Sequence, residues 1–133
     1  MTVVKPKTKN PSGRELTYLN DAVTGVTQAS VPATGSNAAQ FSFFNADGQR
    51  LNSPRLLDAY MSDINGAPVT AITSWVGLVN GYVDPLVSGK IHNVITSAIG
   101  LLGVTFTGTA ATRYCTFVLP NGKLLISGPI IIN

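Results

Sequence analysis

Cys115 and His92 are the two side chains whose chemistry could supply a nucleophile and its general base. The sequence contains one cysteine and one histidine, and a thiol within hydrogen-bonding distance of an imidazole can act in covalent catalysis. Cys115 alternates with Phe117 and Leu119 on one face of a strand-like segment, and a thiol in such apolar surroundings stays neutral and inert. We therefore expect Cys115 to be a core residue. His92, next to Asn93, is expected to be a polar residue at the surface or at an interface.

The sequence offers no set of ligands for a metal ion or a phosphate group. One histidine and one cysteine supply only two soft ligands, fewer than a zinc site needs. Segment 63–66 begins like a calcium-binding loop, but the later acidic ligand is missing from its expected position. Segment 100–103 is too apolar to cradle a phosphate, and we expect it to form a bend. These patterns predict a protein with no catalytic residues, cofactor or metal, which is not an enzyme.

Charge is sparse and unevenly distributed. Charged residues make up 11% of the 133 residues and hydrophobic residues 44%, whereas an average soluble domain carries about 25% charged residues. A surface so poor in charge favours a protein that is buried against other subunits. The net charge is +3; the first fourteen residues carry +4, and the remainder has five basic and six acidic residues, giving −1. The basic character therefore belongs to the N-terminus.

Residues 1–38 are predicted to form an extended N-terminal arm. Pro6, Pro11 and Gly13 oppose regular structure near its start. Its apolar residues would allow it to dock on a neighbouring protein, and the alternative is a flexible leader. A basic tail can meet acidic protein or nucleic acid, but no aromatic residues interleave with its lysines to stack on bases, so we expect no nucleic-acid partner. The candidate partner contacts are Lys5, Lys7, Lys9, Arg14, Leu16 and Tyr18.

Residues 39–133 are predicted to form a β-sheet body. Segment 41–44 is an aromatic strand that leads into a turn at 45–48. In segment 55–62, alternate residues are apolar, which predicts a strand with Leu57, Ala59 and Met61 toward the core. Segment 69–83 is predicted to be strand-like, and the apolar spacing within 90–99 fits either a strand or a short helix.

A β-hairpin is predicted near the C-terminus. Segments 113–119 and 124–126 flank Asn121-Gly122, a pair that favours a two-residue type I′ turn. Together with further Asx-Gly pairs between short strand-like runs, this hairpin indicates an all-β, mainly antiparallel fold, an immunoglobulin-like sandwich or a small barrel with an extended N-terminal arm. No secretory signal or membrane-spanning run is visible, so we expect synthesis and assembly in a cytoplasm.

Three segments resemble small virion proteins of tailed bacteriophages. They are a strand and Asx-x-Asp-Gly turn (43–51), a strand of the type R-L-x-x-x-Y-x-S-D (55–63), and a closing hairpin around V-L-P-N-G-K-L (114–128). The resemblance covers roughly residues 41–63 and 104–132. It implies a capsid decoration (cement) protein or a fibre module, with an immunoglobulin-like sandwich and no catalytic residues.

From this resemblance we expect a decoration protein that stabilises the phage head by bridging capsid subunits. The expected partners are the major capsid protein and the chain itself, as a homotrimer, with no small-molecule substrate and no membrane. The expected location is the capsid exterior of a virion assembled in the host cytoplasm. The alternative is a head-fibre, tail-fibre or adhesion module that binds host glycan or protein through exposed aromatics. Trp75, Tyr82 and Tyr60 are the candidates, but for Trp75 we expect core packing in preference to this role.

Overall fold

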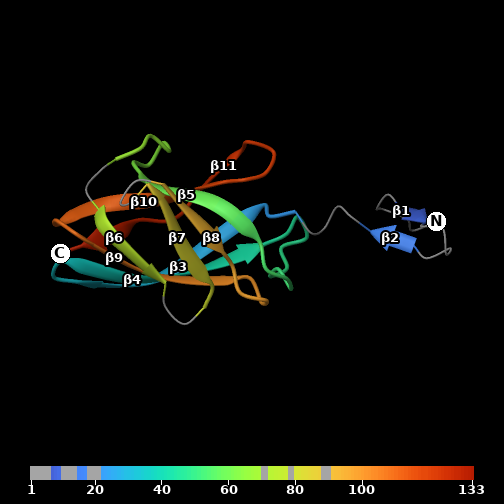
Figure 1. Cartoon of the computed structure of the whole chain (residues 1–133), viewed down its shortest axis with the longest axis horizontal. Helices are drawn as coiled ribbons and strands as arrows, with labels where there is room; N and C mark the ends of the chain where they lie inside the picture. Colours follow the sequence, from blue (N-terminus) through green and yellow to red (C-terminus); the bar gives the residue numbers. More distant parts are fainter. Residues whose placement is uncertain (1–6, 10–14, 18–21, 70–71, 78–79, 88–90) are drawn as a thin grey trace.

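The computed structural model describes residues 7–9, 15–17, 22–69, 72–77, 80–87 and 91–133. In these residues every regular element is a β-strand (Figure 1). The strands are β1 (Lys7–Lys9), β2 (Glu15–Thr17), β3 (Gly25–Ala33), β4 (Ser36–Phe44), β5 (Leu56–Ser62), β6 (Ile72–Gly77), β7 (Tyr82–Val87), β8 (Ile91–Ile95), β9 (Leu101–Gly108), β10 (Ala111–Val118), β11 (Leu124–Ile126) and β12 (Ile130–Ile132).

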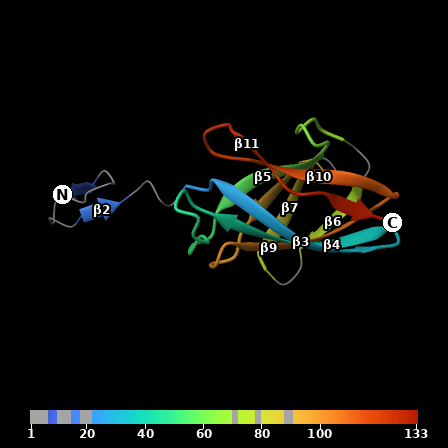
Figure 2. The same ribbon diagram turned by 180° about the vertical axis from the view of Figure 1, so that it is seen from behind.

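Two antiparallel sheets pack face to face to form a sandwich. Sheet I has the order β11-β10-β5-β8-β7, with β12 also paired to β10, and sheet II has the order β3-β4-β9-β6. The two layers and their crossing connections are visible from opposite sides in Figures 1 and 2. The predicted all-β antiparallel sandwich is therefore confirmed.

The strand neighbours partly match those of an immunoglobulin sandwich. The orders β3-β4-β9-β6 and β11-β10-β5 correspond to strands A-B-E-D and G-F-C of that fold, and β8 and β7 extend the second sheet as C′ and C″ do. The connections differ, because β6 precedes β7 and β8 in the chain, whereas strand D follows C′ and C″. The sheets are immunoglobulin-like in neighbours but not in chain order.

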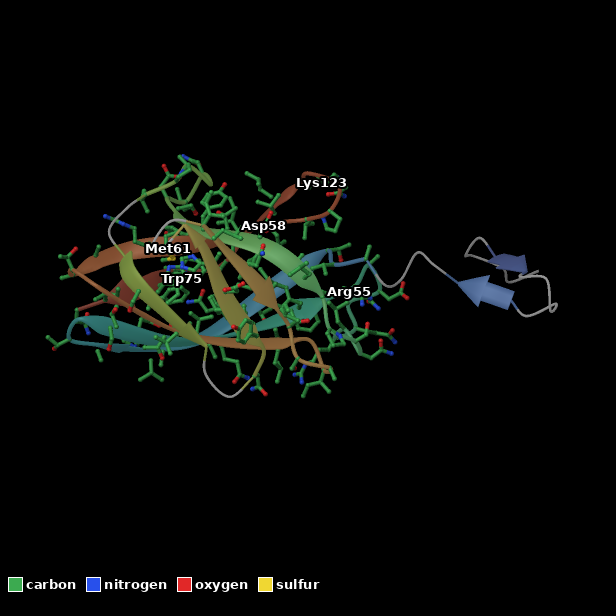
Figure 3. All side chains as sticks on the ribbon, viewed as in Figure 1. Arg55, Asp58, Met61, Trp75 and Lys123 are labelled. Carbon is green, nitrogen blue, oxygen red and sulfur yellow. The ribbon has the colours of Figure 1, made fainter. Side chains whose placement is uncertain are left out.

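The core lies between the sheets and follows from alternation along the strands. Because successive side chains of a strand point to opposite faces, β4 directs Phe41 and Phe43 inward, and β5 directs Leu57, Ala59 and Met61 inward. The inward assignment of these three β5 residues was predicted from the sequence and is confirmed. Figure 3 shows Met61 between the two layers.

The C-terminal strand joins the two sheets along one side. β12 pairs with β10 of sheet I, while the backbone N–H of Asn133 donates to the carbonyl of Ala33 at 3.1 Å and the N–H of Gly35 donates to the carbonyl of Asn133 at 2.9 Å. The buried Asn37 amide nitrogen, on β4, donates to the carbonyl of Ile131 at 2.8 Å. The last strand therefore fastens the β3–β4 turn of sheet II to sheet I.

The sandwich begins earlier in the chain than predicted. Residues 25–33 form β3 and residues 36–38 begin β4, both within sheet II, so the prediction of an arm reaching residue 38 is wrong for these residues. β3 is a half-exposed edge strand built mainly from small residues, so its hydrophobic alternation is weak. Gly35, with a φ of 75°, forms the tight turn that returns the chain into β4.

Two further local predictions are corrected in the same way. The helix alternative for 90–99 is wrong, because residues 91–95 form β8 between β5 and β7. The bend expected at 100–103 is confined to its start, since β9 begins at Leu101. In both places sheet pairing overrides the local pattern.

Four hairpin turns share one geometry that differs from the predicted type I′ turn. In each, a glycine N–H donates to the carbonyl three residues earlier; the glycines are Gly48, Gly66, Gly100 and Gly122. Each glycine has a positive φ, and no other described residue type does. A type I′ turn needs positive φ at both central residues. At the last hairpin Pro120 fixes φ near −65° and favours a type I turn followed by a left-handed glycine.

The first strands, β1 and β2, form a two-stranded antiparallel sheet of their own, in which Lys7 pairs with Thr17 and Lys9 with Glu15. The prediction that Pro6, Pro11 and Gly13 oppose regular structure near the start of the arm is therefore wrong for residues 7–9. Figures 1 and 2 show this pair beyond one end of the sandwich. An isolated two-stranded sheet is marginally stable in water.

Candidate interaction surface

The outward side of sheet I exposes large apolar side chains on three adjacent strands. We name this surface, where β5, β8 and β7 lie side by side, the outer face. Its apolar residues are between 40% and 62% exposed: Leu56, Tyr82, Leu86, Ile91 and Ile95. Monomeric soluble proteins rarely keep such apolar groups together on one surface, and a contiguous patch marks an interaction site.

Strand register places the outer-face residues in rows that cross the sheet. Leu56 lies opposite Ile95, and Ile95 lies opposite Tyr82. In the next row Asn93 lies between Asp58 and Asp84. Neighbouring strands are about 4.8 Å apart, so this row places two carboxylates roughly 10 Å apart in the middle of an apolar surface.

The outer face arises because β7 and β8 carry apolar residues on both sides, and the mainly polar outward side of β5 adds Leu56. Val94 points into the core while its neighbour Ile95 points outward. In the same way, Leu57 points into the core and Leu56 points outward. Strands that are apolar on both faces are typical of sheets covered on both faces. Among the described residues, β5, β8 and β7 are covered by sheet II on their inner side only, so their composition predicts a second covering layer.

The β10–β11 end of sheet I is covered by the chain itself. The hydroxyl of Tyr60 donates to the carbonyl of Gly66 at 2.7 Å, which holds the 63–67 turn over this end. A Cβ built on Gly66 would come within 3.4 Å of Leu124 and Ile126. Beyond this end a hollow of 350 Å³ is lined by residues that include Leu56, Asp58, Val118 and Pro120. The turn and this hollow border the open part of the outer face.

The sheet edges are interrupted in ways that disfavour strand addition. β7 is an edge strand that contains Pro85 and has a register shift between Pro85 and Val87. β6 has a shift between Ile72 and Ser74, and β3 contains Pro32. Proline and bulges are common devices against edge-to-edge association. Among the described strands, the outer face is therefore a better candidate for protein contact than the edges.

The residues predicted as partner contacts that the structure describes lie outside the three strands of this face. Lys5, Arg14 and Tyr18 fall outside the described residues, while Lys7, Lys9 and Leu16 belong to β1 and β2. The sequence analysis missed the outer face itself, except for Tyr60 and Tyr82 as candidate aromatics. The available signal was that apolar residues occupy both odd and even positions in 91–95, namely Ile91, Val94 and Ile95.

His92 lies in the core between the sheets, contrary to its expected place at the surface or at an interface. It is 2% exposed and stacks on Trp75 with ring centroids 4.0 Å apart and planes 13° apart. Burial lowers the pKa of His92 below its ordinary value of 6.5. Trp75, which the sequence analysis assigned to core packing in preference to an exposed binding role, is 9% exposed, so that assignment is confirmed.

Cys115 is fully buried, as predicted, and burial raises the pKa of its thiol. A raised pKa keeps the sulfur protonated and unreactive. Cys115 lies opposite Met61, whereas His92 lies opposite Ala59, two strands away from β10. The Cys–His pair considered from the sequence is therefore not assembled.

The calcium-loop resemblance at 63–66 also has another explanation. One carboxylate oxygen of Asp63 accepts hydrogen bonds from the N–H groups of Asn65, at 2.8 Å, and Ala67, at 3.0 Å. Asp63 therefore caps a turn. In the described ranges, histidine, cysteine and carboxylate side chains nowhere gather in a group of three that could hold a metal ion.

The same part of the chain contains no helix with the length and hydrophobicity of a membrane span. In comparisons with known proteins, the sequence matches no family model and no curated protein.

Proposed function

We propose that the protein is a phage virion structural protein, specifically a capsid decoration protein that stabilises the head by bridging neighbouring capsid subunits. The observation that carries the proposal is the outer face of sheet I, an uncovered apolar surface on a sandwich whose composition predicts a second covering layer. The phage-like turns and strands and the low charge of the chain point to the same class of protein.

Repetition gives such a surface its mechanical value. Completely burying one leucine or isoleucine side chain contributes about 1.5–3 kcal/mol, and the outer-face residues have roughly half of their surface left to bury. Five such residues supply several kcal/mol per copy before the cost of association. A contact of this size repeated over a shell holds neighbouring subunits together through many simultaneous attachments.

The test uses undecorated heads and two matched aspartate substitutions. Ile95→Asp places a charge on the outer face, whereas Val76→Asp places one on the outward side of sheet II, where Val76 is also exposed. We expect the unaltered protein and Val76→Asp to bind heads and to raise the temperature of genome release, and Ile95→Asp to bind at least ten-fold more weakly. Equal binding of the two variants, or no binding of the unaltered protein, would contradict the proposal.

The exposed Tyr82 favours the fibre or adhesion module as a second candidate. Its ring lies on the outer face and is more than half exposed, and exposed aromatic rings are suited to stacking on sugars or to anchoring a protein contact. Tyr82→Ala separates the two functions. A loss of host-cell binding with unchanged binding to heads supports the adhesion function, and the reverse pattern supports decoration.

A further inference from the structure

Both charged residues in the paired rows of the outer face, Asp58 and Asp84, are acidic. The row Asp58–Asn93–Asp84 lies between the row of Leu56, Ile95 and Tyr82 and the row that contains Ile91. No lysine or arginine occupies a position in the paired rows of β7, β8, β5, β10 and β11 on this side. A partner that covers the face must therefore supply positive charge as well as apolar contact, because two desolvated carboxylates without partners would oppose binding.

This requirement argues against two outer faces packing on each other. A symmetric face-to-face pair would bring Asp58 and Asp84 of one copy against the same carboxylates of the other. Like charges brought together in a contact that excludes water are strongly unfavourable. The second copy must therefore approach with a different part of its surface.

The first seventeen residues have the complementary chemistry. Residues 1–14 hold four of the nine basic residues of the chain, and the rest of the chain has a net charge of −1. Lys5, Lys7 and Lys9 occur at every second position. In an extended segment, residues two apart lie on the same side roughly 7 Å apart. Successive lysines in such a segment would therefore face the carboxylates, with Val3, Val4 and Leu16 available for apolar contact.

The point at which this segment leaves the sandwich is close to the outer face. Ala22 and Val23 line a hollow together with Leu119 and Pro120, and the latter two residues also line the hollow beside Asp58. In Figures 1 and 2, β1 and β2 project beyond this end of the sandwich. β1 and β2 therefore lie where a second copy could reach them.

We propose that the outer face of sheet I binds the basic N-terminal segment, residues 1–17, of a second copy of this chain. The inference rests on the same docking surface as the proposed function and adds its partner. Each copy then has one N-terminal segment and one outer face. Two copies can bind each other's segments reciprocally, or several copies can bind segment to face in a closed ring. The association weakens with salt, because salt screens the attraction between the lysines and the carboxylates while both are still exposed in the separate copies.

A charge-swap experiment on the full-length chain in solution tests this inference. Variant one carries Asp58→Lys and Asp84→Lys, and variant two carries Lys5→Glu, Lys7→Glu and Lys9→Glu. Asp47→Lys, in an exposed turn, is the matched control. Sedimentation is measured in low and high salt, and the fluorescence of the single, buried tryptophan reports that each variant is folded.

We expect the unaltered protein and the control to associate in low salt, and each charge variant alone to associate about ten-fold more weakly. Mixing variants one and two should restore association, because each then offers the charge that the other lacks. A monomeric unaltered protein, or association that neither variant weakens, would overturn the inference. A mixture that stays monomeric would also overturn it.

The outcomes separate this inference from the proposed function. If the charge-swap pair associates but the unaltered protein does not bind heads, the decoration function fails and the inference stands. If the unaltered protein and the charge variants all remain monomeric in solution but bind heads equally well, the inference fails and the decoration function stands.

Discussion

The rings of Trp75 and His92 stack almost parallel across the sandwich, Trp75 from β6 of sheet II and His92 from β8 of sheet I. Figure 3 shows Trp75 between the layers. The stack ends a series of ring contacts through the core, since Phe106 meets Trp75 edge-on at 5.0 Å. The other contacts in the series are Phe41–Phe106, Phe41–Phe117 and Phe43–Phe117. A titratable ring is thus part of the packing that joins the sheets.

Burial of His92 predicts a stability that falls in mild acid. Because its folded-state pKa lies below 6.5, the unfolded chain binds a proton more readily than the folded chain. The free energy of unfolding should therefore be fully maintained above pH 6.5 and should decrease as the pH falls below it. Urea titrations at pH 7.5 and 5.5 measure the effect.

His92→Phe is the matched control, because it keeps an aromatic ring on Trp75 and removes the titration. His92 is the only histidine, so the decrease between pH 7.5 and 5.5 should be much smaller in this variant. An equal decrease in both proteins would show that the titration of His92 does not set the acid sensitivity.

Cys115 is predicted to be inert in the folded protein. Its side chain is fully buried and its thiol pKa is raised, so a thiol reagent at pH 8 should label it only through unfolding. Labelling should be slow in buffer and complete within minutes in concentrated urea. Rapid labelling in buffer would contradict the buried position of the sulfur.

Gly81 and Gly122 form a matched pair for testing the turns. Both have a positive φ, of 77° and 83°, but a Cβ on Gly122 would meet no atom within 4 Å, whereas a Cβ on Gly81 would lie 2.6 Å from the carbonyl oxygen of Ile95. Gly122→Ala should cost only the backbone strain of about 1 kcal/mol. Gly81→Ala should cost more, about 3 kcal/mol or above, because strain and a backbone clash add. Denaturant titrations compare the two, and equal losses would contradict the packing around Gly81.

The sheet fold was predictable where a strand has one buried and one polar face. In β5 the alternation of Leu57, Ala59 and Met61 predicted both the strand and its inward side. β3 was not recognised, because an edge strand of small, half-exposed residues carries little hydrophobic alternation. The type I′ prediction failed because Asn121-Gly122 was considered without the restriction that Pro120 places on the turn.

The outer face could not be located from the sequence because two of its strands, β7 and β8, carry apolar residues on both sides. In 91–95, alternation alone does not say which of Val94 and Ile95 points to the core, and only the pairing with β5 and β7 decides it. The position of His92 depends in the same way on register. Long-range pairing, which local patterns do not encode, sets both features.

Oxidative footprinting of protein bound to undecorated heads tests the central claim most directly. On binding, Tyr82, Leu86, Ile91 and Ile95 on the outer face should react much less than they do in the free protein at high salt, where the copies are separate. Val76 on the outward side of sheet II should react as it does in the free protein. Unchanged reactivity of the four outer-face residues, or protection of Val76 in their place, would contradict the assignment of the outer face as the docking surface.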